Sequence, residues 1–171
     1  MGTIITDLKE KFRNGDIVVR LIYINVAVFI VTFLAGVVCK LMGWGEIGSF
    51  SFLAFPASFD KFLLQPWSII TYMFMHGGVW HILFNMLCLY WFGEIFLMSF
   101  STKHLRGLYF LGGIAGAVLF MLSYNIFPYF QPAIDSSVVV GASASILAII
   151  IAVAYRQPNY RVQLFLIGNV S

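Results

Sequence analysis

Long apolar runs separated by short polar turns dominate this sequence. The runs cover residues 21–38, 80–98, 107–127 and 141–155, and a further run begins at residues 162–170. A membrane-spanning helix needs about 20 mainly apolar residues, and the first three runs are close to that length. The pattern predicts an all-α polytopic membrane protein with four full spans and the start of a fifth.

The fourth run is short for a span. As a helix its residues would rise only about 22 Å, whereas the hydrocarbon core is about 30 Å thick. A helix this short starts below the membrane surface, where irregular backbone must be buried in protein or line a water-filled cavity. We therefore expect Ser143, near the start of the run, to lie at the floor of such a cavity.

Two histidines and an asparagine introduce the second run. His81 and Asn85 are four residues apart and lie on one face of a helix, and His76 comes just before them. An imidazole N–H and an amide N–H that converge in a water-poor site suit a developing oxyanion. The alternative is a hydrogen bond that only joins two helices of a bundle.

Residues 41–66 fit neither a span nor an ordinary solvated loop. Three glycines and two prolines interrupt the segment, and Glu46, Asp60 and Lys61 add charge, while six aromatic residues lie among them. This composition favours short amphipathic turns that lie in the membrane surface. A mobile aromatic-rich loop is the alternative.

Composition supports a membrane protein and narrows its partners. The chain is 61% hydrophobic and 10% charged, against about half and about a quarter in ordinary soluble domains. The net charge of +3 is too small to indicate a nucleic-acid partner. Cys39 closes the first apolar span and Cys88 lies in the second, and a cysteine in such a setting usually acts as a small buried hydrophobe. We expect a lipid bilayer as surroundings and no cofactor, metal site or nucleic acid.

The basic residues predict the orientation. If the spans alternate, only Lys40 and Lys61 fall on one side, and the other side carries Lys9, Lys11, Arg13, Arg20, Lys103, Arg106, Arg156 and Arg161. By the positive-inside rule the N-terminus is cytoplasmic, and we expect an integral multi-pass protein of a bacterial inner membrane. Residues 1–20 would form a cytoplasmic segment and residues 21–171 the transmembrane domain.

Two motifs resemble those of one known family. His76, His81 and Asn85 are similar to the second-span motif of the rhomboid intramembrane serine proteases. Residues 141–144, Gly-Ala-Ser-Ala, resemble the glycine-x-serine-x motif of their fourth span. Residues 41–66 are similar to their membrane-embedded first loop. The resemblance covers nearly the whole chain and implies a rhomboid-like helical bundle.

The resemblance also implies a reaction, hydrolysis of a peptide bond in a transmembrane substrate through an acyl-enzyme. Ser143 would be the nucleophile. His81, Asn85 and the Ser143 backbone N–H would form the oxyanion hole, with His76 close by. A serine hydroxyl needs a base, and the tetrahedral intermediate needs donors where its charge develops.

The sequence departs from the family pattern at three positions. Ser68 stands where the first loop of the family carries the arginine of a tryptophan–arginine pair. Ala144 follows the serine where many relatives have glycine. Leu147 stands where some relatives carry a tyrosine that packs on the catalytic histidine.

The base is missing from the pattern. In the family it is a histidine of the sixth span, and this sequence has only His76, His81 and His104. We expect these 171 residues to be the N-terminal part of a six-span protein and to be inactive alone. The alternatives are a non-catalytic relative that binds membrane-protein clients, and a structural bundle whose polar residues only pack.

Overall fold

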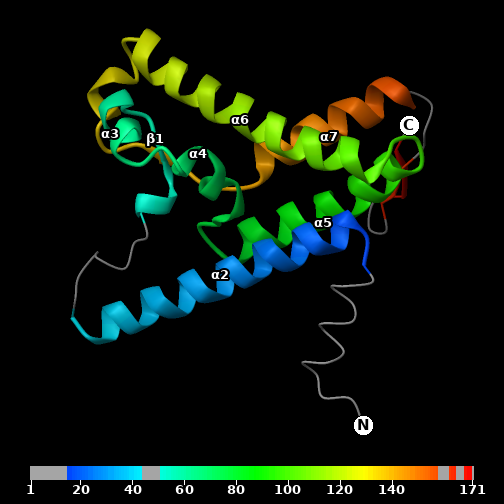
Figure 1. Ribbon diagram of the computed structural model, residues 1–171, viewed down its shortest axis with the longest axis horizontal. Coiled ribbons are helices and arrows are strands. Elements are labelled where there is room, and N and C mark those ends of the chain that lie inside the picture. The colour runs from blue at the N-terminus through cyan, green and yellow to red at the C-terminus, as the bar shows by residue number, and fades with distance from the viewer. Residues whose placement is uncertain (1–14, 44–50, 158–161, 165–167, 171) are drawn as a thin grey trace.

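The structure, a computed structural model, describes residues 15–43, 51–157, 162–164 and 168–170 (Figure 1). Its α-helices are α2 (Ile17–Leu41), α3 (Phe59–Leu64), α4 (Ser68–Thr71), α5 (Val79–Leu97), α6 (Thr102–Ile126) and α7 (Ser143–Arg156). The 3-10 turns are η2 (Ser51–Leu53), η3 (Tyr72–Phe74) and η4 (Gln131–Ala133). Two antiparallel strand pairs join β1 (Phe55–Pro56) to β2 (Val138–Val139) and β3 (Val162–Leu164) to β4 (Gly168–Val170).

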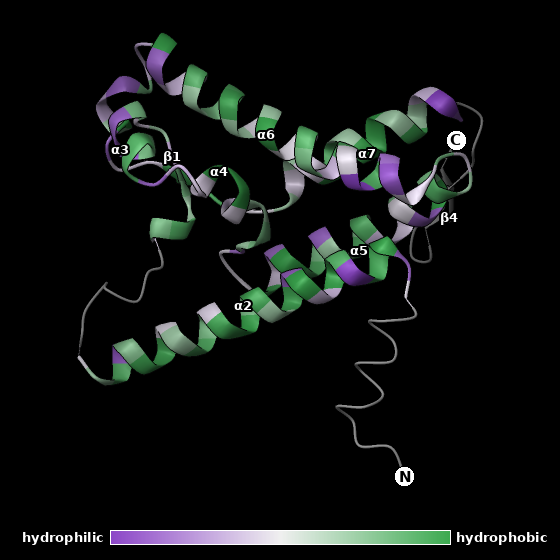
Figure 2. Cartoon of the chain, in the orientation of Figure 1, coloured by the Kyte–Doolittle hydropathy of each residue, from purple (hydrophilic) through white to green (hydrophobic). Residues whose placement is uncertain are grey.

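Three of these helices are long and apolar enough to cross a membrane. α2 and α6 have 25 residues each and α5 has 19, and apolar residues occupy much of their length (Figure 2). The predicted all-α polytopic membrane fold is confirmed. The fourth predicted span corresponds to α7, which has only 14 residues and rises about 21 Å.

α2 and α5 lie side by side (Figure 1). The Asp16 carboxylate accepts a hydrogen bond from a backbone N–H in the first turn of α2, which caps the helix. Gly93 lets the two helices approach, because an added Cβ would lie 2.6 Å from a Val18 methyl carbon. Asn25 donates to the Tyr109 hydroxyl of α6 at 3.2 Å, so one polar residue joins two helices as expected inside a membrane bundle.

α6 and α7 pack closely through small residues. A Cβ added to Gly112 would lie 2.5 Å from the Ala148 Cβ, and one added to Gly116 would overlap the Ala144 Cβ. Small residues four apart on both helices allow this approach. The contact includes the second residue of α7, so it fixes the start of that helix against α6.

The segment before α5 folds into short turns held by side-chain donors. Three side chains donate to three successive backbone carbonyls, Trp67 to Phe52 at 2.8 Å, Thr71 to Leu53 at 2.7 Å and Gln65 to Ala54 at 3.1 Å. Unpaired carbonyls inside a membrane are costly, so such bonds can replace regular structure there. The predicted short turns are confirmed for residues 51–66, and their place in the membrane surface stays a prediction. Residues 44–50 lie outside the described part of the chain.

β1 connects this segment to the backbone that leads into α7. It pairs with β2, and the Ala57 N–H extends the pairing by donating to the Ser137 carbonyl at 3.0 Å. On α6, the Asn125 side chain also donates to the Ala57 carbonyl at 3.0 Å. Strand pairing and this amide therefore fix the approach to Ser143 from one side.

Residues 162–164 and 168–170 differ from the predicted start of a fifth span. The strands β3 and β4 pair antiparallel, with Gln163 opposite Asn169 in the register. The sequences Val-Gln-Leu and Gly-Asn-Val alternate apolar and polar residues, which is the period of a strand. An isolated helix of so few residues would be marginal.

Candidate active site

Gly141 places the backbone directly before α7. Its N–H donates to the Tyr72 carbonyl at 2.9 Å, and its φ of 122° lies in a region that favours glycine. An added Cβ would lie 2.8 Å from His81 Nε2 and 3.9 Å from Asn85 Nδ2. The glycine therefore lets the backbone lie close to a ring nitrogen and an amide nitrogen, where a side chain would collide with His81. We call the region bordered by Gly141 and these two nitrogens the Gly141 position.

His81 stands in the first turn of α5 and is half-buried. The Gly77 backbone N–H donates to its Nδ1 at 3.4 Å, which is a long bond. When Nδ1 of a neutral imidazole accepts, the proton is on Nε2. Because Nε2 is the nitrogen nearest the Gly141 position, His81 presents an N–H donor to it.

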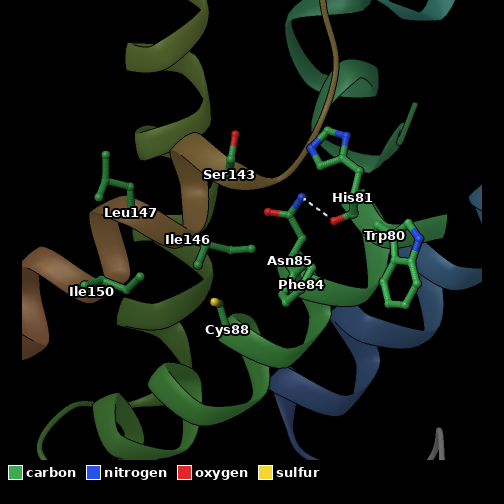
Figure 3. A pocket seen from close by; sticks show the side chains of 9 residues that line it. All are labelled: Trp80, His81, Phe84, Asn85, Cys88, Ser143, Ile146, Leu147 and Ile150. Atoms are coloured by element: carbon green, nitrogen blue, oxygen red, sulfur yellow. Dashed lines mark hydrogen bonds between the residues drawn. The ribbon is translucent and has the colours of Figure 1, made fainter. Parts of the chain in front are cut away.

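Asn85 lies one turn further along α5 and is 8% exposed. Its Nδ2 donates to the His81 backbone carbonyl at 3.0 Å. This bond fixes the amide orientation, because the reverse orientation would bring two oxygens together. The second N–H of the same nitrogen is left for a ligand, and the amide oxygen is directed toward the side of α7 (Figure 3).

Ser143 is the first residue of α7 and is exposed to a cavity between α5 and α7 (Figure 3). The cavity has a volume of about 530 Å³, which is within the usual range for ligand sites. Its lining consists of Trp80, His81, Phe84, Asn85, Cys88, Ser143, Ile146, Leu147 and Ile150. The structure thus brings together three of the four predicted site residues, His81, Asn85 and Ser143.

His76 lies beside His81 and is not among the residues that line the cavity. It is 6% exposed, and the two ring centres are 5.1 Å apart in an edge-to-face contact. Neither His76 ring nitrogen makes a hydrogen bond of normal geometry within the described residues. Burial lowers the pKa of His76 to about 4, the His81 ring contributes in the same direction, and the Phe74 backbone acts weakly against both. His76 is therefore neutral at pH 7.

No hydrogen bond joins Ser143 to a histidine in the part of the chain that the structure describes. His104 stands in the first turn of α6, where it pairs with the Ser101 hydroxyl at 2.9 Å. Along α6 it is about 18 Å from Gly116, the residue opposite the start of α7. The site contains a candidate nucleophile and two donors, and none of the three histidines is placed as a base.

The three departures from the family pattern have different structural settings. The Ala144 methyl packs against Gly116, so a glycine on α6 accommodates the extra carbon. Ser68 is fully buried and its hydroxyl has no partner among the described residues. Leu147 lines the cavity and is 55% exposed.

Several residues that shape the site were not predicted to belong to it. Cys88 and Ile146 line the cavity, and Tyr72 holds Gly141. Cys88 could have been found from its position three residues after Asn85 on the same helix face. Tyr72 gives no such signal, because its bond to Gly141 joins residues far apart in the sequence.

The fold and the site together define an integral membrane protein in which a serine hydroxyl, an imidazole and an amide share a cavity between helices. The model of the Rhomboid domain matches residues 63–170, more than half of the chain. The chain therefore belongs to the rhomboid family.

Curated relatives of the chain include three proteins of Arabidopsis thaliana. It is 26% identical over 160 residues to RHOMBOID-like protein 12, mitochondrial, and the aligned region covers 88% of this chain and 44% of that relative. It is 40% identical over 59 residues to Rhomboid-like protein 16, chloroplastic, an alignment that covers 34% of this chain and 18% of the relative. It is 27% identical over 86 residues to RHOMBOID-like protein 7, an alignment that covers 50% of this chain and 24% of the relative. The chain spans less than half the length of these relatives, and no solved structure matches it significantly.

Proposed function

We propose that this chain carries the nucleophile and the oxyanion hole of an intramembrane serine endopeptidase that cleaves transmembrane proteins. The observation that supports the proposal is the cavity shared by Ser143, His81 and Asn85. The Ser143 hydroxyl would attack the scissile carbonyl carbon, and the amine fragment would leave as an acyl-enzyme forms. Water would then release the acid fragment from the serine.

In this proposal the oxyanion occupies the Gly141 position. The Nε2–H of His81 and the free N–H of Asn85 would donate to it, with the Ser143 backbone N–H as a third donor. The backbone N–H groups in the first turn of a helix have no intrahelical partner and are available for such a role. Preorganised donors of this kind act strongly in a site that excludes water.

We further propose that the base is a histidine other than the three in this sequence. His104 is remote, His76 is buried beside His81, and His81 directs a protonated nitrogen to the Gly141 position. Without a base, serine is a poor nucleophile, and losing the base of a serine protease costs a factor on the order of 10⁴. The chain alone should therefore be proteolytically inactive.

A non-catalytic protein that binds membrane-spanning clients is the second candidate. One observation favours it, because the Ser143 hydroxyl makes no hydrogen bond to a histidine among the described residues. The largely apolar lining of the cavity suits a client helix as well as a substrate.

We propose the cytoplasmic side of a bacterial inner membrane for the N-terminus and the turn before α6. Lys103, Arg106 and Arg156 are exposed at that end of the helices and support this orientation. The relatives reported above are plant proteins, so the membrane and the orientation need separate tests. An epitope tag at residue 2, tested for antibody access from each side of the native membrane, measures the orientation of the N-terminus in whichever membrane holds the protein.

Rescue by free imidazole tests the proposed activity. The chain in liposomes is treated with a fluorophosphonate, with and without imidazole, and the labelled residue is located by mass spectrometry. Imidazole in the cavity would supply the absent base, so we expect an adduct on Ser143 that depends on imidazole and is lost in Ser143→Ala. Ser145, fully buried two residues later, is an internal control and should stay unlabelled.

Two results would contradict the proposed activity, no adduct on Ser143 with imidazole, or equal adducts on Ser143 and Ser145. The client-binding candidate predicts instead that a transmembrane peptide crosslinks to a photoreactive residue placed at Leu147 while Ser143 stays unmodified.

A further inference from the structure

Tyr72 contacts three parts of the fold that meet at the candidate site. Its hydroxyl donates to the Gly113 carbonyl of α6 at 2.5 Å. Its backbone carbonyl accepts the Gly141 N–H at 2.9 Å. Its ring packs on Phe55 of β1, with ring centres 5.9 Å apart. The residue is 2% exposed, so these contacts are made away from water and lipid.

The contacts of Tyr72 form a continuous connection from α6 to the Gly141 position. A Cβ added to Gly116 would lie 3.5 Å from the Tyr72 hydroxyl oxygen, an ordinary van der Waals distance, so Gly116 of α6 also borders the hydroxyl. At the other end, Gly141 borders His81 Nε2. If Tyr72 moved, its backbone hydrogen bond to Gly141 would move Gly141 relative to His81 Nε2.

We infer that Tyr72 is a positioning residue. Its hydroxyl anchors its own backbone to α6, so that its carbonyl holds Gly141 close to His81 Nε2, at the border of the proposed oxyanion position. The inference rests on the proposed function only in naming that position an oxyanion site. The placement of Gly141 can be measured whether or not the chain hydrolyses a peptide.

Tyr109 provides a matched control. It is also fully buried, and its hydroxyl donates in the opposite direction, from α6 to the Met73 carbonyl of η3 at 3.3 Å. It accepts a second hydrogen bond from Asn25. Tyr72→Phe and Tyr109→Phe therefore each remove one buried hydroxyl from the same contact between η3 and α6, but only Tyr72 is bonded to Gly141.

The sequence allows the Gly141 amide to be observed selectively. Val140–Gly141 is the only Val-Gly pair in the chain. With carbonyl-¹³C valine and ¹⁵N glycine, one amide signal is split by its ¹³C neighbour, and its hydrogen exchange can be followed in the full chain in detergent micelles or nanodiscs.

We expect the Gly141 amide to exchange about tenfold faster in Tyr72→Phe, the effect of weakening one hydrogen bond, and to change less than about twofold in Tyr109→Phe. Equal acceleration in both variants would mean general loosening and would overturn the inference, as would an unchanged rate in Tyr72→Phe. If Gly141 exchange responds to Tyr72→Phe as expected but Ser143 is not labelled, only the proposed function is contradicted. If Ser143 is labelled but Gly141 exchange does not respond as expected, only the role of Tyr72 is contradicted.

A second variant keeps the test valid if Tyr72→Phe does not fold. Site-specific replacement of Tyr72 by 3-fluorotyrosine retains the ring and the hydroxyl and makes the hydroxyl a stronger donor. The Gly141 amide resonance should then shift, while the same replacement at Tyr109 should leave it in place. An unmoved Gly141 resonance in the Tyr72 variant would also overturn the inference.

Discussion

The two faces of α7 differ in how they meet their neighbours. On one face, Ala144 and Ala148 contact glycines of α6 so closely that no further carbon fits. On the other face, Leu147 and Ile150 border a cavity of about 530 Å³ between α7 and α5. Ser143 stands at the start of the helix, where both faces meet. The closed face fixes the position of the serine, and the open face leaves space beside it.

Membrane physics explains why the two faces can coexist. Lipid tails are as apolar as leucine, so helices in a membrane associate through close packing and hydrogen bonds rather than through burial of apolar area. The small residues of α6 and α7 supply such packing. An apolar surface left open on the other face loses little, because lipid or a substrate segment can cover it. We therefore expect substitutions on the open side to change the reactivity of Ser143, and substitutions on the closed side to change the free energy of unfolding.

The largest effect is expected for Asn85→Ala in the imidazole-supported labelling of Ser143. One oxyanion donor is typically worth about 10² to 10³ in rate. We expect labelling to slow by about that factor without being abolished, because His81 and a backbone N–H remain as donors. Cys88→Ala, in the same lining, is the control and should label at the parent rate. An unchanged rate in Asn85→Ala would assign the amide to structure alone.

The next effect concerns His76, the buried neighbour of His81. Its folded pKa of about 4 lies below the ordinary value of 6.5, so the unfolded chain binds more protons between these values. The stability contributed by neutral His76 is present above pH 6.5 and is lost as the pH falls to 4. We expect a loss of about 3 kcal/mol in the free energy of unfolding over this range. Unfolding in detergent measures it.

His76→Leu should flatten this pH dependence, whereas His104→Leu, at an exposed histidine, should retain it. If the slopes of the parent and His76→Leu coincide, another group titrates and the buried, neutral state of His76 is wrong.

On the closed face, Gly116→Val should destabilise the chain by about 1 to 3 kcal/mol or more, because added carbons in a close contact displace the backbone. The free energy of unfolding in mixed micelles is the measurement. Leu147→Phe adds bulk on the open face and should be tolerated. Similar losses in the two variants would remove the distinction between the faces.

The smallest effect is expected for Leu147→Ala. The side chain is 55% exposed to the cavity, so its removal should change the free energy of unfolding by less than about 0.5 kcal/mol. Ile149→Ala, at a fully buried position of the same helix, should cost about 2 to 5 kcal/mol. A loss at Leu147 as large as that at Ile149 would show that the cavity is filled in the folded protein.

The sequence predicted the local parts of this account. Apolar runs of span length marked α2, α5 and α6, because a bilayer imposes that length on any crossing helix. The i, i+4 spacing placed His81 and Asn85 on one face, since a helix has a fixed period.

The sequence did not predict contacts that depend on tertiary structure. Nothing in the motif around Ser143 indicates that Tyr72 holds Gly141, or that Gly116 accommodates the methyl of Ala144, because each pair comes together only after folding. Residues 162–164 and 168–170 illustrate a different error, since a short apolar run can form a strand or a helix and its composition alone does not decide.

The most direct test is an experimental structure of the chain carrying a phosphonate on Ser143, prepared with imidazole. We predict that the phosphonyl oxygen lies in the Gly141 position, about 2.7 to 3.1 Å from His81 Nε2 and within reach of the Asn85 amide nitrogen. An oxygen directed toward Leu147 and Ile150, with no donor near it, would contradict the assignment of an oxyanion hole.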